Sequence, residues 1–402
     1  MGLVSFHGER LWDGGARRRQ RAVTFLSLAL IAVVALAGPL LALPVRWSLP
    51  VVLGELLAGV LIGRTGLALV DPADPTFSLL ANIGFALMMF VAGTHVPVRD
   101  PAIRSALGQG ARRAVLAAAA AALLGTALGL AFGTGHAPLY VVLLASSSAA
   151  LVLPIVDSLR LGGPQVVAMT AQVAIADIAC ILALPLAVDP PNAVRTALGA
   201  LAVGICAAAL FFALHSLERS GTRQRMHRLS EDRKFALELR IQLALLFALA
   251  GVANFGGVSV MLAGFSFGLV VAAVGEPRRL ARQLFAVSDG FLGPIFFVWL
   301  GASLNLRDLA GHPEMAALGL SLGVGTVLLH AGLRASGLPL PLGVLSAAQL
   351  GIPVAAASIG TQLHVLQPGE DAALLLGALV TIAASSLGGA RAARSFAMPL
   401  KA

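Results

Sequence analysis

A single acidic residue interrupts one of the long apolar segments of this chain. The segment runs from Pro164 to Val188, and Asp177 lies halfway along it. A carboxylate at the centre of a bilayer costs roughly 2.5–3.5 kcal/mol on insertion scales, so it is kept where it faces a cavity, a partner or a passing ion. Cys180 lies one helical turn further on, and Thr170 lies two turns back, on the same face. We therefore expect Asp177 to be a shared site for a cation and a proton, with Thr170 as possible support.

The chemistry expected of such a group is exchange. Burial of a carboxylate favours its neutral, protonated form over its charged form. The group can release its proton, bind a cation in its place, and trade the two again on the other side of a membrane. The alternative is a structural carboxylate that bonds a neighbouring hydroxyl.

Other ionisable residues also lie within apolar stretches. Glu55 is the second acid at membrane depth, and a structural bond or a part in transport are both open for it. His330 lies in the last third of its apolar stretch and is a candidate charge partner of Asp177. His95, at the end of another stretch, fits an interfacial histidine better than a functional one.

The composition indicates that these segments cross a membrane. Of the 402 residues, 58% are hydrophobic and 12% are charged, whereas a soluble domain averages about 25% charged. This balance is typical of an all-α polytopic membrane protein. Hydropathy predicts about thirteen spans. They lie near residues 22–44, 47–63, 77–97, 114–134, 138–158, 164–188, 195–215, 241–254, 257–275, 285–304, 314–333, 340–363 and 371–390.

The charge distribution predicts how the chain is oriented. The net charge of +9 reports basic cytoplasmic loops and not a nucleic-acid partner. The Arg-rich loops place the C-terminus in the cytoplasm and the N-terminus outside, in a bacterial plasma membrane. Residues 1–21 form a polar basic tail without a signal-peptide cleavage pattern. Residues 22–390 form the membrane domain, and residues 391–402 a cytoplasmic tail.

Two sequence matches at nearly equal offsets indicate an internal repeat. VAGTHVPVRDPA at 91–102 matches WLGASLNLRDLA at 299–310, and LAGVLIG at 57–63 matches LAGFSFG at 262–268. An odd number of spans separates the copies, so the repeats, near 47–188 and 257–390, have opposite orientations in the membrane. Inverted repeats are common in secondary transporters. Chance similarity among Gly-rich and Leu-rich spans is the alternative.

Corresponding spans of the two repeats carry signals for an interrupted helix. The first contains SSSAALVLP, in which Ser147 and Ser148 precede Pro154; the second has Gly351 and Pro353 at mid-span. Broken backbone at this depth is tolerated where it is buried in protein or lines a cavity. We predict that two discontinuous helices cross beside Asp177 and offer oxygens to a monovalent cation. Ordinary kinked helices are the alternative.

These motifs resemble a known family. LPVVLGELLAGVLIGRTGL (49–67), ANIGFALMMFVAG (81–93), SSSAALVLP, QVAIADIACILAL (172–184) and GPIFFVWLGASLNL (293–306) are similar to the bacterial sodium/hydrogen exchanger domain, in its potassium-efflux-like branch. The resemblance implies thirteen helices, a dimerising scaffold and a core that moves like an elevator. It implies that Asp177 matches the invariant aspartate, and that Ser147 and Ser148 match, within one position, polar residues of the crossing helix.

The chain also departs from the family pattern. Ala176 stands where relatives carry Asp, Asn or Gln, so one-for-one exchange of Na⁺ or K⁺ for a proton is favoured. Gly-Thr-His (93–95) replaces Gly-Leu-Glu, Gly-Ile-Pro (351–353) replaces Gly-Glu-Phe, and the usual lysine of the eleventh helix is missing. We expect no cofactor and no nucleotide-binding regulatory domain in this chain.

Three functions remain open from the sequence. Cation:proton antiport by a homodimer in lipid is the leading one. A passive cation pathway and a degenerate scaffold or sensor on the same fold are the others. We expect no enzyme activity, because no nucleophile–base or metal-ligand constellation appears in the sequence.

Overall fold

The computed structural model describes residues 24–43, 51–94, 96, 101–220, 237–275 and 278–398. The predicted tail at 1–21, His95 and residues 399–402 lie outside the described residues. The described chain is almost entirely helical. The helices are α1 (Phe25–Ala35), α2 (Ala37–Ala42), α3 (Val51–Ile62), α4 (Pro75–Thr94), α5 (Pro101–Phe132), α6 (Ala137–Ala145), α7 (Ala149–Ser158), α8 (Pro164–Val188), α9 (Ala193–Arg219), α11 (Leu237–Phe255), α12 (Val260–Val274), α13 (Arg278–Val287), α14 (Gly293–Ser303), α15 (Leu306–Gly311), α16 (Pro313–Gly332), α17 (Leu340–Ser346), α18 (Gly351–Gln362) and α19 (Glu370–Phe396).

The helices confirm a polytopic membrane protein. Among the described residues, 11 helical segments are long and apolar enough to cross a membrane, and the apolar helices α3 and α12 are shorter, with 12 and 15 residues. Each of the thirteen predicted spans overlaps a helix or a pair of consecutive helices. Because α3 and α12 are shorter than these segments, the number of thirteen membrane crossings stays a prediction. Helix α19 continues to Phe396, so the tail predicted from residue 391 begins as helix.

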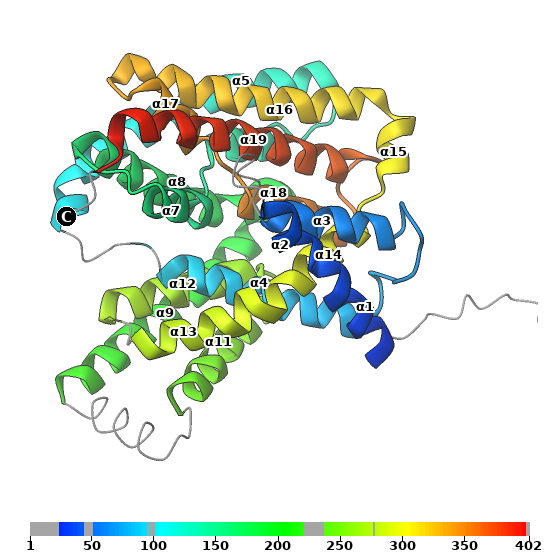
Figure 1. Cartoon of the computed structure of the whole chain (residues 1–402), viewed down its shortest axis with the longest axis horizontal. Coiled ribbons are helices and arrows are strands. Elements are labelled where there is room, and N and C mark those ends of the chain that lie inside the picture. The colour runs from blue at the N-terminus through cyan, green and yellow to red at the C-terminus, as the bar shows by residue number, and fades with distance from the viewer. Residues whose placement is uncertain are drawn as a thin grey trace, which may run out of the picture.

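The helices form two groups (Figure 1). One group contains α5, α7, α8, α16, α17 and α19, and α6 packs against α5 and α8. The other contains α4, α9, α11, α12 and α13, with α3 and α14 packed together and against α4 through α14. Helix α18 lies between the groups and contacts α6, α8 and α19. A short π-helical segment, Ser288–Leu292, joins α13 to α14.

The order of elements repeats. A short helix, a longer one, a span, an interrupted span and a final span follow one another as α3, α4, α5, α6–α7 and α8. The corresponding elements of the second half are α12, α14, α16, α17–α18 and α19, with α13 and α15 intervening. Here the first helix, α12, is longer than α14, with 15 residues against 11. The starts of the first matched motif, 91–94 and 299–302, therefore lie on α4 and α14, and the second matched motif falls on α3 and α12, as the sequence repeat predicts.

Glycines of the matched motifs make corresponding contacts between the repeats. A Cβ at Gly59 of α3 would lie 2.2 Å from the carbonyl oxygen of Val298 in α14, and one at Gly264 of α12 would lie 2.3 Å from that of Ala86 in α4. Backbone and backbone touch at both crossings, so only glycine fits. Each repeat thus packs its first helix, α3 or α12, against the second helix of the other repeat, α14 or α4.

Candidate functional site

The two interrupted helices cross, and their unwound segments pair with each other. Residues 146–148 separate α6 from α7, and residues 347–350 separate α17 from α18. The backbone N–H of Ser148 donates to the carbonyl of Ala348 at 2.8 Å. The hydroxyl of Ser147 donates to the carbonyl of Ser346 at 2.7 Å. Backbone groups released by unwinding thus find partners in the other repeat, which stabilises the break inside a membrane.

Asp177 lies in α8, and its side chain contacts the start of α7. Its side chain is buried, with 7% exposed, and its Oδ2 accepts the backbone N–H of Ala149 at 2.9 Å. Ala149 is the first residue of α7, and the preceding Ser148 does not cap that helix with its own side chain. The first N–H groups of a helix have no partner within it, and the positive end of the helix dipole favours an anion there. A carboxylate from α8 therefore takes the place of an N-cap.

The other predicted site residues differ in their hydrogen-bond partners. The Ser148 hydroxyl has no hydrogen-bond partner within the part of the chain that the structure describes. Thr170 Oγ1 donates within its own helix, to the carbonyl of Val166 at 3.0 Å. His330 is buried near the crossing, but its Nδ1 pairs with Ser346 Oγ at 3.2 Å and not with Asp177. The crossing therefore brings His330 to the second break, and it leaves the hydroxyl of Ser148 without a partner among the described residues.

Glu55 lies outside the crossing. It is buried in α3, and its side chain packs against Gly38 of α2, where a Cβ would lie 2.7 Å from Glu55 Cγ. This position belongs to the group of helices that does not contain Asp177.

Of the residues expected at the helix breaks, Pro154 needs a correction. Pro154 lies inside α7, six residues beyond Ser148, which is the last residue of the unwound stretch. The interruption instead falls at the serines, where the crossing supplies partners for the released backbone. Gly351 begins α18, and Pro353 lies in its first turn, where its missing N–H removes no intrahelical bond. Gly351 and Pro353 thus follow their break directly.

Sequence reasoning missed Gln349, which lies in the second unwound segment. Its side chain is buried, and its Nε2 donates to the carbonyls of Leu143 and of Ser146, the latter at 3.1 Å. Its backbone N–H donates to Thr381 Oγ1 of α19 at 3.3 Å. A carboxamide in an apolar segment, two residues before the predicted break at Gly351, was the available signal.

Two cavities lie where the two helix groups meet. One, of about 420 Å³, is lined by residues of α4, α11 and α12 on one side and of α18 on the other. The second, of about 340 Å³, is lined by residues of α4, α14, α18 and α19. Asn82, Ser358 and Gln362 line both. Polar side chains therefore line the space between α18 and the second group.

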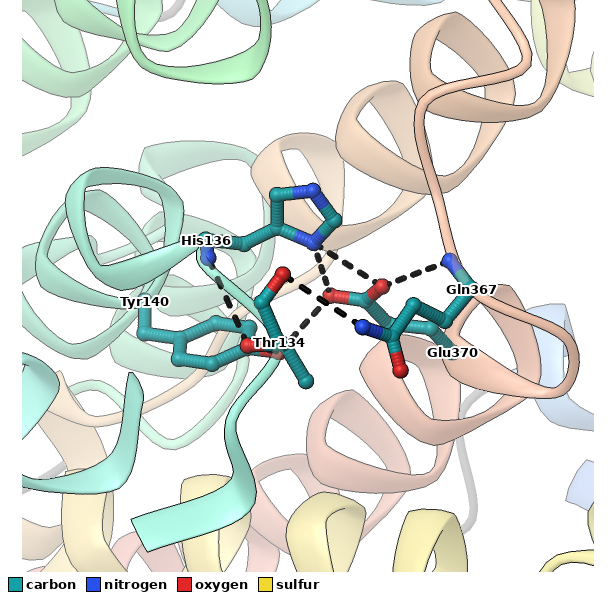
Figure 2. Close-up of polar contacts among 5 residues, drawn as sticks. All are labelled: Thr134, His136, Tyr140, Gln367 and Glu370. Atoms are coloured by element: carbon teal, nitrogen blue, oxygen red, sulfur yellow. Dashed lines mark hydrogen bonds and ion pairs between the residues drawn. The ribbon is translucent and has the colours of Figure 1, made fainter. Parts of the chain in front are cut away.

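A second polar cluster, also missed from the sequence, joins the two repeats at one end of the first helix group (Figure 2). Nδ1 of His136 lies 2.7 and 2.9 Å from the two carboxylate oxygens of Glu370. The Tyr140 hydroxyl lies 2.7 Å from Glu370 Oε1 and 2.8 Å from Thr134 Oγ1, and the backbone N–H of Gln367 donates to Glu370 Oε2 at 2.8 Å. This cluster fastens the loop before α6 to the start of α19.

The surroundings of His136 favour its charged form. The hydrogen bond from its ring to Glu370 raises the pKa of His136 above its usual value, partial burial opposes this, and the negative charge of Glu370 and the carbonyl of Val365 add to the rise. Imidazolium has two N–H donors, and each finds an acceptor here.

Among the described residues, no group of three or more His, Cys, Asp or Glu side chains is arranged to hold a metal ion. The oxygens of the crossing come from one carboxylate, from hydroxyls and from carbonyls, beside the carboxamide of Gln349 and the ring of His330. Such oxygens suit a hard cation that passes through rather than a resident transition metal.

A helical membrane protein in which two interrupted helices cross beside a buried carboxylate has the architecture of a secondary transporter. The chain belongs to the sodium/hydrogen exchanger family: the model of its transmembrane domain matches residues 29–389. The sodium proton antiporter MjNhaP1 from Methanocaldococcus jannaschii has the same fold, with a TM-score of 0.62 and 16% identity over 93% of this chain and 99% of that one.

Relatives with curated names agree with the family. The putative Na(+)/H(+) antiporter YjbQ of Bacillus subtilis is 26% identical over 88% of this chain, and the probable Na(+)/H(+) antiporter 3 of Methanocaldococcus jannaschii is 25% identical over 85%. The glutathione-regulated potassium-efflux system protein KefC of Salmonella typhi is 30% identical over 77%. The match spans 61%, 89% and 50% of these relatives respectively.

Proposed function

We propose that this protein exchanges a monovalent cation, Na⁺ or K⁺, for a proton across the bacterial plasma membrane, with Asp177 as the shared site. The observation that carries the proposal is the position of Asp177. One buried carboxylate meets the N-terminus of α7 where two unwound segments supply hydroxyl and carbonyl oxygens. With one carboxylate, the site holds either a proton or a cation, so exchange is one for one.

The N–H of Ala149 and the dipole of α7 support the ionised carboxylate after its proton leaves. A dehydrated cation then needs further oxygens, and the hydroxyl of Ser148, which precedes Ala149 in the chain, has no partner among the described residues. When the cation leaves, burial favours return of a proton. The cation and the proton therefore exclude one another by competing for the same charge.

Alternating access follows from the two helix groups. We assign α5–α8 and α16–α19 to a moving core, and the remaining helices to a scaffold through which two copies form a homodimer in lipid. The two cavities separate α18 of the core from α4, α11, α12 and α14 of the scaffold. Sliding of the core against this cavity-lined boundary carries Asp177 from one side to the other. The membrane domain spans 22–390, with repeats near 47–188 and 257–390, and the C-terminus is cytoplasmic.

The test uses purified protein in vesicles with an imposed pH gradient and a fluorescent pH indicator. Addition of Na⁺ or K⁺ is expected to dissipate the gradient, at a rate that an imposed membrane potential does not change. Asp177→Asn is expected to abolish this flux, while Asp157→Asn, at the exposed end of α7, retains it. Flux at the parent rate in Asp177→Asn contradicts the proposal, and potential-driven flux without proton movement indicates a passive pathway instead.

A further inference from the structure

Gln349 lies at the helix break of the second repeat, and its side chain bonds the helix break of the first repeat. It lies between α17 and α18, and its side chain is 3% exposed. Its Nε2 donates to the carbonyls of Leu143 and Ser146, which are the last turn and the C-cap of α6. One side chain therefore uses both of its N–H donors on the C-terminal end of the opposite half-helix.

The end of α6 is where such donors matter. The last four carbonyls of a helix have no partner within it, and together they form the negative end of the helix dipole. In a membrane, carbonyls left open would need water or a cation. Gln349 donates to one of them, that of Leu143, which also accepts the N–H and the hydroxyl of Ser146. Its second contact is the carbonyl of the C-cap residue Ser146, which is thereby held by a neutral donor.

The backbone of Gln349 is also fixed. Its N–H donates to Thr381 Oγ1 at 3.3 Å, and the Thr381 hydroxyl donates to the carbonyl of Ala378 at 2.7 Å. Thr381 is fully buried in α19. The side chain of Gln349 is thus held against α6 from a segment that is itself anchored to α19.

The position of Ser146 links this contact to Asp177. Ser146 begins the unwound segment that ends at Ser148, and the next residue, Ala149, donates its N–H to Asp177. Holding the Ser146 carbonyl therefore fixes the short stretch of backbone that carries the Ser148 hydroxyl to the carboxylate. A shift of this stretch alters the distance between the hydroxyl and Asp177 without touching either group.

We propose that Gln349 is a positioning residue of the cation site, which holds the first break in register with Asp177 through the carbonyl of Ser146. This inference rests on the proposed exchange. It concerns cation affinity and not the proton step, because Gln349 does not contact Asp177 in any hydrogen bond among the described residues.

The test compares Gln349→Met with the parent in the vesicle assay. Methionine preserves the length and shape of the side chain but has no N–H donors. Without those donors the carbonyl of Ser146 is no longer held, so the apparent KM for the cation is expected to rise about tenfold, which corresponds to about 1.4 kcal/mol. The maximal rate and the pH dependence of that rate are expected to stay within about threefold, because a factor of three corresponds to less than 1 kcal/mol. Gln109→Met, at an exposed position of α5 that lines neither cavity, is the matched control and is expected to match the parent.

A second variant keeps the proposal testable if Gln349→Met does not fold. Thr381→Val removes the acceptor of the Gln349 N–H at nearly constant volume, and a smaller rise in KM is expected from it. A parental KM in Gln349→Met, or a fall in maximal rate with unchanged KM, overturns the positioning role. If the parent itself shows no cation-driven proton flux, the proposed function fails instead, so the two failures are distinguishable.

Discussion

The carboxylate of Asp177 accepts the N–H of Ala149 at 2.9 Å, from a helix 28 residues earlier in the chain. This contact joins a membrane-spanning helix to the start of the half-helix that follows the first break. It gives the carboxylate one fixed donor, and in the proposed function the other oxygen binds the exchanging ion. The geometry thereby limits which substitutions at 177 can preserve the structure.

Asp177→Glu is expected to lose exchange although it keeps the charge. The extra methylene moves the carboxylate past the Ala149 N–H in a closely packed crossing, and overpacking costs about 1–3 kcal/mol. We expect the exchange rate to fall at least about tenfold, while Asp177→Asn keeps an acceptor for Ala149 and unfolds at nearly the parental temperature. Vesicle flux and thermal unfolding in detergent measure the two effects. Full activity of Asp177→Glu would contradict the fixed geometry.

The two serines of the first break are expected to differ. The Ser147 hydroxyl bonds the Ser346 carbonyl, so Ser147→Ala is expected to lower the free energy of unfolding by about 1 kcal/mol. The Ser148 hydroxyl is free among the described residues, so Ser148→Ala is expected to leave stability unchanged and to raise the KM for the cation. Denaturation and vesicle flux, measured on both variants, separate the roles. Equal effects of the two substitutions would refute the distinction.

Gly264→Ala is expected to disrupt packing between the repeats. The added Cβ would lie 2.3 Å from the Ala86 carbonyl oxygen, and neither backbone can move without opening the crossing of α4 and α12. We expect a loss of at least about 1–3 kcal/mol. Gly251→Ala in α11 is the control, because nothing lies within 4 Å of its added Cβ, and it is expected to be neutral or stabilising. Thermal unfolding in detergent measures both; equal melting temperatures would contradict the close contact.

The His136–Glu370 pair is expected to make stability depend on pH. The pKa of His136 is raised in the folded state, chiefly by its hydrogen bond to Glu370, so the folded protein binds the proton more tightly than the unfolded chain. The stabilisation is therefore complete below the unfolded pKa of histidine, about 6.5. It is lost as the pH rises through the folded value.

The measurement is the melting temperature across neutral and alkaline pH. It is expected to fall with rising pH in the parent and to fall less in His136→Gln. His364→Asn is the control, because His364 is exposed, does not join the cluster, and has a positive φ that asparagine tolerates. An unchanged pH profile in His136→Gln would show that the pair does not contribute.

Much of the fold could be predicted from the sequence, because hydropathy and helical periodicity are local properties. The apolar segments fall on the observed helices, and the matched motifs fall on corresponding helices of the two repeats. The breaks were found within the correct spans. Pro154 was a wrong marker, since a proline removes only one hydrogen bond, whereas the serines before it find partners in the other repeat.

What the sequence by itself determined is the class of protein, the spans, the repeat and the one acid at mid-span. Only the tertiary structure decided that Asp177 caps α7, that Gln349 closes the end of α6, and that His136 pairs with Glu370. The physical reason is that backbone released from a helix inside a membrane must find a partner. That partner can lie some two hundred residues away, where neither composition nor periodicity records it.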